Sequence, residues 1–475
     1  MNLANMISSE ELLSKKNSIK KIFFFRICGT GMGACACLLK ENGYEVEGAD
    51  QSFYPPMSTY LESTGIPLHP LESVDAKFLS NYDLIIVGNS VPRLSDGARL
   101  IEECGVQFTS FPNALGTLLL SDKKVIGVAG THGKTTTTFF LTQMFDRLKV
   151  KAGYFVGGIL NDRPPSTLGE DKYFVIESDE YDSAYFQKFS KFRLYELDKM
   201  ILTSLEFDHA DIYNSVEEIE AEFEAVIPKL DTIIADSTYS SIEKLKNKFK
   251  DQKWHLYNNE TGPLNISGDK DKTNFQVVLY KEIYSFQTNI IGAHNIYNIT
   301  SCIILLHLEG FSVSDIQHAV ADLSLVKRRQ EKRGLYNGAI VIDDFAHHPR
   351  AISLTVDAIK TKYPEREIIT IFEPVSATAR SNVFQEEFAK SLMSSDEVII
   401  AKSPMATTAK NSNNLDCEKL VDELKAHCKS ALVIDNLNDL RNQIKRISND
   451  KNLILVLSNR SCLGLWESDF VKELI

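Results

Sequence analysis

Residues 124–138 combine the residue types of a phosphate-binding site. An apolar, valine-rich run leads into a glycine loop, then Gly133-Lys134-Thr135 and a predicted helix. Backbone N–H groups freed by the glycines and the positive end of the helix can surround the phosphates of a nucleotide. Lys134 adds a positive charge, and the Thr135 hydroxyl can reach a magnesium ion. The segment predicts ATP binding by Gly130, Thr131, His132, Gly133, Lys134, Thr135 and Thr136.

The spacing of this loop differs from the common one. Four residues usually separate the first glycine from Gly-Lys, whereas five separate Gly127 from Gly133. The tight element is therefore the shorter Gly130-x-x-Gly133-Lys134-Thr135, which argues against ordinary GTPases and kinases. A glycine turn before a helix that binds nothing is the structural alternative.

Two acidic clusters follow the next two apolar runs. The run 173–176 is followed by acids from Glu177 to Asp182, and the run 200–205 by a cluster that includes Asp208 and His209. Ligands of open α/β sheets collect beyond the carboxyl ends of the strands, so these side chains should face Lys134. Carboxylates and one imidazole suit Mg²⁺ held partly by substrate phosphates. The alternative is that the acids lie in solvated turns.

The first part of the chain has a different glycine pattern. Residues 1–20 form a polar leader, frayed or helical, without chemistry of its own. Residues 21–27 predict a strand, 28–33 a glycine turn, and the following residues a helix and a second strand that ends at Asp50. This opening is typical of dinucleotide folds, in which the glycines admit a pyrophosphate. The pattern Gly29-x-Gly31-x-Gly33 lacks the full motif, so it gives little support to NAD binding.

The last part of the chain alternates strands with helices. A basic run at 327–333 precedes a strand at 339–342, and strands at 367–372, 397–401, 431–434 and 453–457 complete a doubly wound pattern. At 475 residues and roughly 150 residues per domain, about three domains are expected. We predict an α/β protein with a leader (1–20), a Rossmann-like domain (21–120), a central P-loop ATPase-like domain with a mainly parallel sheet (121–323) and a C-terminal Rossmann-like domain (324–475).

Composition limits the class of protein. The formal net charge of -12 argues against nucleic acid as the main partner. No segment approaches the roughly 18 apolar residues of a membrane span, and the N-terminal apolar run is too short for a signal sequence. The eight cysteines show no C-x-x-C pair, which predicts neither zinc nor a disulfide framework. These features predict a cytoplasmic enzyme.

Together the motifs resemble those of the Mur ligases. The resemblance covers nearly the whole chain and lies in the phosphate loop, Glu177, Asp208-His209, Gly292-x-His294-Asn295-x-x-Asn298 and residues 343–349. It implies ATP-dependent joining of an amino acid or peptide to a UDP-linked muramyl carboxylate, through an acyl phosphate. Within the family, residues 54–59, 205–211 and 327–329 resemble the murein-recycling peptide ligases more than the alanine-adding ligases. The implied substrates are UDP-N-acetylmuramate, ATP and the tripeptide L-alanyl-γ-D-glutamyl-meso-diaminopimelate.

The resemblance also implies roles for single residues. Lys134, Glu177 and His209 are the expected catalytic residues: Lys134 holds the β- and γ-phosphates, and the others help to bind two Mg²⁺ ions, one of them with Thr135. The remaining ATP contacts are expected from Asn295, Arg329 and Asp344. The peptide should meet Phe345, His347 and Arg380, and the UDP sugar should meet Gly29, Thr30, Gly31, Met32, Asp50 and Asn89. A monomer or weak oligomer is expected.

Several positions depart from the family pattern. Arg26 stands where the UDP loop usually begins with glycine, Val375 replaces an arginine and Ala377 an asparagine, and residues 458–464 replace a glycine-rich loop. Loss of an arginine can remove a charge-assisted contact worth about 1.5–3 kcal/mol. Two alternatives therefore stay open: an L-alanine ligase of peptidoglycan biosynthesis, and a nucleotide-binding sensor that has lost catalysis.

Overall fold

The computed structural model describes residues 2–55, 57–158, 160 and 163–475. Pro56, a member of the 54–59 motif, lies outside the described residues. The chain forms two compact units. The first comprises Met1–Leu205, Glu220–Leu256 and Ile304–Leu306, and the second Glu206–Ile219, Tyr257–Ile303 and His307–Ile475.

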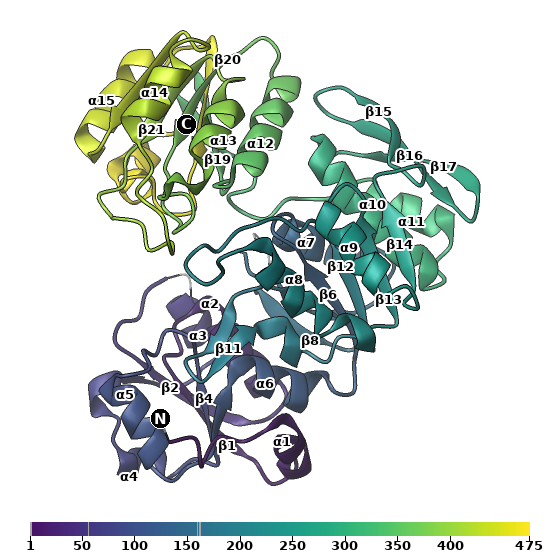
Figure 1. The fold of residues 1–475 in the computed structure, drawn as a ribbon, viewed down its shortest axis with the longest axis vertical. Helices are drawn as coiled ribbons and strands as arrows, with labels where there is room; N and C mark the ends of the chain where they lie inside the picture. Colours follow the sequence, from purple (N-terminus) through teal and green to yellow (C-terminus); the bar gives the residue numbers. More distant parts are fainter. Residues whose placement is uncertain (1, 56, 159, 161–162) are drawn as a thin grey trace. The chain divides into compact units, whose positions relative to one another are not determined.

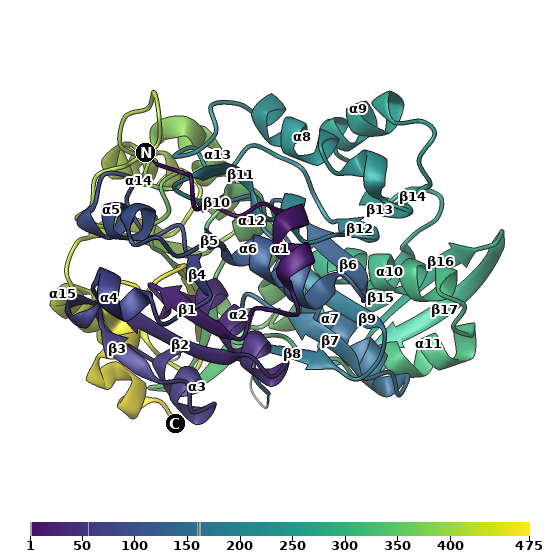
Figure 2. The ribbon, with the colours of Figure 1, turned by 90° about the horizontal axis from the view of Figure 1, so that it is seen from below.

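The first unit begins with a five-stranded parallel sheet of order β3-β2-β1-β4-β5. Its strands are β1 (Lys21–Phe25), β2 (Glu45–Asp50), β3 (Leu68–Pro70), β4 (Leu84–Val87) and β5 (Phe108–Ser110). Figure 2 shows β3, β2, β1 and β4 side by side. The accompanying helices are α2 (Thr30–Glu41), α3 (Met57–Ser63), α4 (Ala76–Leu79), α5 (Asp96–Glu103) and α6 (Phe111–Leu115). The continuous apolar run of β1 is explained by burial on both faces of a parallel sheet.

The leader is helical and joins this sheet. α1 (Ser9–Lys15) begins with a capping box between Ser8 and Glu11. Leu12 is fully buried, and the Ile7 N–H donates to the Phe108 carbonyl at 3.0 Å. Residues 7–15 therefore belong to the first unit, and of the two forms expected for the leader the structure has the helical one.

The central sheet has the order β14-β13-β12-β6-β9-β7-β8. β13 (Thr232–Asp236), β12 (Lys199–Leu202), β6 (Lys124–Ala129), β9 (Tyr173–Ser178) and β7 (Ala152–Phe155) pair in parallel, and β8 (Ser166–Gly169) is antiparallel to β7. β14 (Trp254–Tyr257) lies at the other edge, and β10 (Asp182–Ala184) pairs with β11 (Gln187–Ser190) in a separate ribbon. The helices of this region are α7 (Lys134–Arg147), α8 (Val216–Glu224) and α9 (Ser240–Lys248).

The second unit contains an antiparallel sheet and a larger mixed sheet. The first consists of β15 (Leu264–Gly268), β16 (Thr273–Leu279) and β17 (Glu282–Thr288), followed by α10 (Ala293–Leu308) and α11 (Val313–Val320). The larger sheet has the order β18-β19-β23-β20-β21-β22, and only β18 is antiparallel to its neighbour. Its strands are β18 (Glu331–Tyr336), β19 (Ala339–Asp344), β20 (Glu367–Phe372), β21 (Glu397–Ala401), β22 (Ser430–Ile434) and β23 (Asn452–Leu457).

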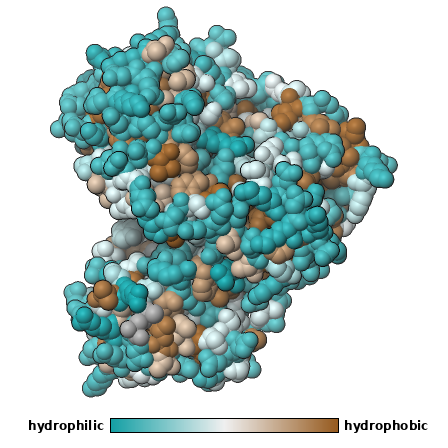
Figure 3. Space-filling model, in the orientation of Figure 1, coloured by the Kyte–Doolittle hydropathy of each residue, from teal (hydrophilic) through white to brown (hydrophobic). Residues whose placement is uncertain are grey.

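Two apolar layers cover the faces of this six-stranded sheet. α12 (Pro349–Lys362), α13 (Gln385–Leu392) and α14 (Cys417–Leu424) pack on one face, and α15 (Leu437–Ile447) packs on the other (Figure 1). The loops at the carboxyl ends of the strands are thereby held on a rigid base. The face of the molecule seen in Figure 3 is mainly hydrophilic. Within the described residues, no helix combines the length and apolar character that crossing a membrane requires.

Candidate active site

The phosphate loop joins β6 to α7 in the first unit. Gly130 has a φ of 124°, and a Cβ atom there would lie 2.5 Å from the Ser204 carbonyl oxygen. Gly133 has a φ of 83° and forms the N-cap of α7 without a side-chain hydrogen bond. The His132 N–H donates to Ser204 Oγ at 2.7 Å. The loop therefore needs glycine at residue 130, where the backbone passes close to the end of β12.

Lys134 lies at the start of α7 and is held by acids that follow β9. Its Nζ donates to Glu180 Oε2 at 2.8 Å and to the Gly130 carbonyl at 2.7 Å, and it lies 3.8 Å from Asp179 Oδ1. Burial lowers the pKa of Lys134, but Glu180 and Asp179 outweigh it and hold the pKa above its usual value. Lys134 is therefore a fixed positive charge at a helix N-terminus, the arrangement that anionic phosphates favour.

Thr135 and Glu177, two of the residues predicted to bind a metal, lie side by side. The Thr135 hydroxyl donates to Glu177 Oε1 at 2.8 Å, and the Gly157 N–H donates to Glu177 Oε2 at 2.8 Å. Burial raises the pKa of Glu177, while Lys134 opposes the rise. A hydroxyl and a carboxylate oxygen placed side by side are the hard oxygen donors that Mg²⁺ prefers, so these two residues fit the ion.

The predicted UDP-sugar residues lie around the carboxyl ends of β1, β2 and β4. Gly29 is the N-cap of α2, which begins with Thr30, Gly31 and Met32. Asp50 ends β2, and its Oδ2 accepts the Cys28 N–H at 2.8 Å, so the acid holds the glycine turn. Asn89 follows β4 in an exposed turn.

Arg26 lies in a left-handed turn directly after β1. Its φ is 70°, a conformation that glycine adopts more readily than other residues. The N–H groups of Arg26 and Ile27 both donate to the Ala49 carbonyl, at 2.9 and 3.0 Å. The Arg26 guanidinium lies 3.7 Å from Asp50 Oδ1. The departure from glycine therefore adds a cation beside the predicted UDP site.

In the second unit, His209 lies in a tightly held loop. Its φ is 54°, and its N–H donates to Asp208 Oδ1 at 2.7 Å. The next residue, Ala210, donates its N–H to Thr378 Oγ1 at 3.1 Å. Burial raises the pKa of Asp208, but the imidazoles of His209, His347 and His348 lower it by a larger amount. The pKa of Asp208 is therefore below its usual range. The structure thus gathers histidines around a buried carboxylate at this loop.

Three predicted ATP residues also belong to the second unit. The Asn295 amide donates to the Ile291 carbonyl at 2.9 Å and is 3% exposed, so its nitrogen serves the helix start. Asp344 accepts the N–H groups of Gln330 and Ala346, both at 2.8 Å. Burial raises the pKa of Asp344, and Arg329 opposes the rise. Arg329 and Asp344 are therefore close enough to interact electrostatically.

The predicted peptide residues Phe345 and His347 lie immediately after β19. The Arg329 guanidinium lies 5.0 Å from the centre of the Phe345 ring, and the rings of Phe345 and His347 meet edge to face at 5.7 Å. Arg380 is 8% exposed and follows β20. Its guanidinium contacts the Met405 sulfur at 3.5 Å.

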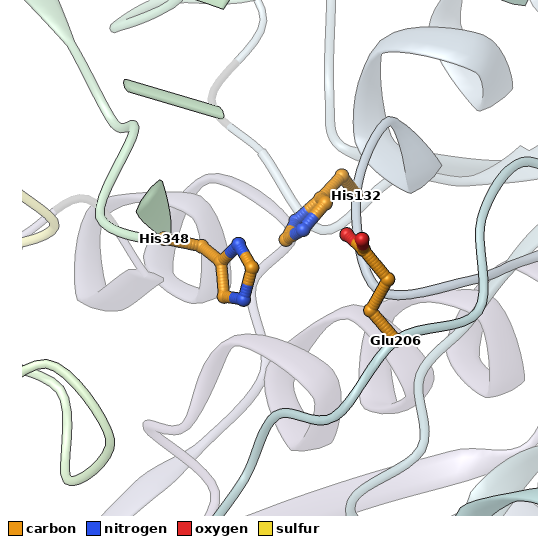
Figure 4. A group of neighbouring side chains, drawn as sticks. All are labelled: His132, Glu206 and His348. Carbon is orange, nitrogen blue, oxygen red and sulfur yellow. The ribbon is translucent and has the colours of Figure 1, made fainter. Parts of the chain in front are cut away.

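Some side chains at these sites could not be selected from the sequence. Glu180 is the main partner of Lys134, yet it is one of several acids after β9, and no spacing rule identifies it. Figure 4 shows Glu206 and His348 of the second unit. Arg350 Nη1 lies 3.1 Å from Glu206 Oε1. The rings of His348 and Phe384 meet edge to face, with their centres 4.8 Å apart. His132, also labelled in Figure 4, belongs to the first unit.

Comparison with known proteins identifies the family. Three family models match: the Mur ligase family catalytic domain at residues 21–122, the Mur ligase middle domain at 128–306 and the Mur ligase glutamate ligase domain at 328–460. The chain therefore belongs to the Mur ligase family. It is an ATP-dependent ligase that forms amide bonds, and its three α/β domains agree with the predicted fold class.

Individual relatives cover almost the whole chain. The UDP-N-acetylmuramate–L-alanyl-γ-D-glutamyl-meso-2,6-diaminoheptandioate ligase of Haemophilus influenzae is 33% identical over 94% of this chain and 98% of its own. The UDP-N-acetylmuramate–L-alanine ligase of Streptococcus mutans is 30% identical over 97% of both chains. The crystal structure of a murein peptide ligase from Psychrobacter arcticus has a TM-score of 0.67 and 29% identity, over 94% of this chain and 97% of its own.

Proposed function

We propose that the protein joins the tripeptide L-alanyl-γ-D-glutamyl-meso-diaminopimelate to the carboxylate of UDP-N-acetylmuramate, with ATP, in peptidoglycan recycling. The observation that carries the proposal is the phosphate loop, in which Lys134 is fixed by Glu180 while Thr135 and Glu177 share a hydrogen bond. The specificity for a tripeptide is supported by the higher identity to the peptide ligase than to the L-alanine ligase.

The reaction divides into two steps, a phosphoryl transfer and the formation of the amide bond. A carboxylate oxygen of the muramate attacks the γ-phosphorus of ATP, ADP leaves, and an acyl phosphate forms. The peptide amine then attacks the acyl carbon, and the tetrahedral intermediate expels inorganic phosphate as the nitrogen loses a proton. Lys134 and the N–H groups of residues 130–136 would balance phosphate charge in both steps.

Magnesium would be held by Thr135 and Glu177, with a second ion near His209, and it would neutralise phosphate charge when bound. We further assign Asn295, Arg329 and Asp344 to ATP, and Phe345, His347 and Arg380 to the peptide. Gly29, Thr30, Gly31, Met32, Asp50 and Asn89 are assigned to the UDP sugar. We place the domains at 21–120, 121–323 and 324–475, after the leader at 1–20, and expect a cytoplasmic monomer or weak oligomer.

The test is ADP release with UDP-N-acetylmuramate and Mg-ATP, comparing tripeptide, L-alanine and no acceptor, with the product identified by mass. Tripeptide-dependent ADP and UDP-muramyl-tripeptide are expected. Turnover with L-alanine in preference to the tripeptide would favour the second candidate, an L-alanine ligase of peptidoglycan biosynthesis. The 30% identity to the L-alanine ligase of Streptococcus mutans is the observation that supports this candidate. ATP binding without turnover of any acceptor would favour a sensor.

A further inference from the structure

The His209 segment, residues 206–214, follows strand β12 of the central sheet in the chain but belongs to the second compact unit. The chain leaves the first unit after Leu205 and returns to it at Glu220. The segment is therefore attached covalently to the central sheet, whereas its packing assigns it to the unit that contains the six-stranded sheet. Contacts within the second unit should accordingly decide how the segment is held.

His209 opens a tight turn in an unfavourable backbone conformation. Its φ is 54°, in the left-handed region that is costly for a residue with a Cβ atom. Its carbonyl accepts the N–H groups of Ile212 at 2.8 Å and Tyr213 at 3.0 Å. Such a conformation persists where the surrounding structure fixes it. The direction of the His209 side chain therefore depends on what holds this turn.

Two loops of the six-stranded sheet hold the residue after His209 by both of its backbone groups. The Ala210 N–H donates to Thr378 Oγ1 at 3.1 Å, and the Ala210 carbonyl accepts the Lys410 N–H at 2.8 Å. Lys410 Nζ also donates to the Ile212 carbonyl at 2.5 Å. Ala210 is 2% exposed, so water has little access to a backbone group that loses its partner there. Three hydrogen bonds from outside the segment thus fix the turn.

The two holding loops, which follow β20 and β21, are joined to each other. Thr407 Oγ1 donates to the Ala377 carbonyl at 2.8 Å, and the Leu415 N–H donates to the Arg380 carbonyl at 2.7 Å. Thr378 itself is buried. Its hydroxyl is therefore presented by a stitched pair of loops at the carboxyl end of the sheet, and not by a free surface turn.

Side chains of the His209 segment contact the same unit. Arg350 Nη1 lies 3.1 Å from Glu206 Oε1, and the rings of Phe207 and Phe384 have centres 6.5 Å apart. Both members of the ion pair are more than a quarter exposed, so the pair contributes little. The hydrogen bonds to buried backbone groups of Ala210 are therefore the contacts that fix the segment most strictly.

We propose that Thr378 and Lys410 are positioning residues, which fix the turn at Ala210 and thereby the direction in which the His209 imidazole is presented. Both act through the His209 segment and not on a substrate. The inference rests on the proposed function for one point, the assignment of His209 to a metal ion. A role of Thr378 in general stability is the alternative, and it would affect the whole second unit.

Hydrogen exchange of the ligand-free, full-length protein tests the positioning without any substrate. Thr378→Val removes the hydroxyl that accepts the Ala210 N–H and keeps nearly the same side-chain shape. Exchange in a peptide spanning residues 206–214 should become about three- to tenfold faster, because a buried N–H loses its partner. Thr378→Ser keeps the hydroxyl and should exchange like wild type. Thr361→Val in α12 is the matched control, since that hydroxyl donates to the Asp357 carbonyl of its own helix at 2.9 Å.

A second variant addresses the other holding loop. Lys410→Met removes the hydrogen bond to the Ile212 carbonyl and should also speed exchange in the segment, about three- to tenfold. Lys425→Met is its control, because Lys425 pairs with Asp422 on the surface at 2.9 Å and should leave the segment unchanged. If Thr378→Val does not fold, this pair of lysine variants decides.

Kinetics distinguish positioning of His209 from a merely structural contact. In Thr378→Val the Mg²⁺ concentration that gives half-maximal ADP release should rise at least about threefold, because a metal ligand loses part of its support. The KM for ATP at saturating Mg²⁺ should stay within about twofold, and Thr378→Ser should restore the wild-type Mg²⁺ requirement. Thr361→Val should match wild type in both measurements.

Three results would overturn the proposal. The first is unchanged exchange in residues 206–214 of Thr378→Val, and the second is faster exchange throughout the second unit. The third is an unchanged Mg²⁺ requirement despite faster exchange, because the turn would then not position His209. Failure of the proposed function looks different, since wild type would release no ADP with any acceptor. The exchange comparison then decides alone: faster exchange confined to the segment supports the positioning, and equal exchange rejects it.

Discussion

Replacing Glu180 by glutamine should destabilise the phosphate loop, because the amide cannot balance the charge of Lys134. Glu180 is 2% exposed and lies 2.8 Å from Lys134, whose side chain is 11% exposed. Removing one partner of a buried pair costs about 3–5 kcal/mol. Lys134 keeps the Gly130 carbonyl at 2.7 Å and Asp179 at 3.8 Å, so we expect a loss of about 2–3 kcal/mol in the free energy of unfolding of the first unit.

A double-mutant cycle with Lys134→Met isolates the pair. The double variant loses both charges. Its free energy of unfolding should be about 2 kcal/mol higher than the value obtained by adding the losses of the two single variants. Urea unfolding can be followed in a Trp466→Phe background, where Trp254 alone reports on the first unit. The control is Lys151→Gln, because the Lys151–Glu170 pair is two-thirds exposed and should contribute about 0–1 kcal/mol. Additivity of Glu180→Gln and Lys134→Met within about 0.5 kcal/mol would refute the buried pair.

Three further outcomes are expected. Glu177→Gln keeps an acceptor for the Thr135 hydroxyl but loses the carboxylate charge. The Mg²⁺ concentration that gives half-maximal ADP release should therefore rise about tenfold or more. An unchanged Mg²⁺ requirement would contradict a role of Glu177 in metal binding. Gly130→Ala should cost roughly 3 kcal/mol in urea unfolding, because its φ is 124° and the new Cβ meets the Ser204 carbonyl; wild-type stability would contradict this. Burial, then Arg329, lowers the pKa of His294 to about 4, so the folded form resists protonation and wild type loses stability as pH falls from about 6.5 towards 4. Because the His294 side chain is partly exposed, solvent screening reduces the effect, and we expect His294→Gln to lose about 1 kcal/mol less stability than wild type between pH 7 and 5. If the urea midpoints of both proteins fall by the same amount over this pH range, the prediction is wrong.

The strands were predicted well where apolar runs are continuous. The expected runs 367–372 and 397–401 coincide with β20 and β21, because a strand buried on both faces admits few polar residues along its length. The loop between β6 and α7 was equally predictable, since glycines and Gly-Lys-Thr fix its conformation locally. β6 and β9 are neighbouring parallel strands, so Glu177 was expected to face the phosphate loop; its hydrogen bond with Thr135 was not predicted.

Partners chosen by tertiary packing could not be predicted. The acids from Glu177 to Asp182 are alike in the sequence, and only the turn after β9 decides that Glu180 meets Lys134. Glu373 and Leu463 are separated by ninety residues, and their hydrogen bond exists because β20 and β23 are neighbours in the sheet. Sequence reasoning identifies residue types near the end of a strand, whereas side-chain pairing depends on angles set by the whole sheet.

Three residues in the loops that depart from the family pattern adopt a backbone conformation typical of glycine. Arg26, Cys462 and Leu463 all have a φ between 51° and 70°, a conformation that costs a residue with a Cβ atom about 1–2 kcal/mol. Hydrogen bonds offset the cost: Arg26 donates to Ala49, and both residues of the second loop donate to Glu373. Such strain persists only where the surroundings fix the loop. Arg26, Cys462 and Leu463 can therefore stand in left-handed turns, because local hydrogen bonds offset the conformational cost of each turn.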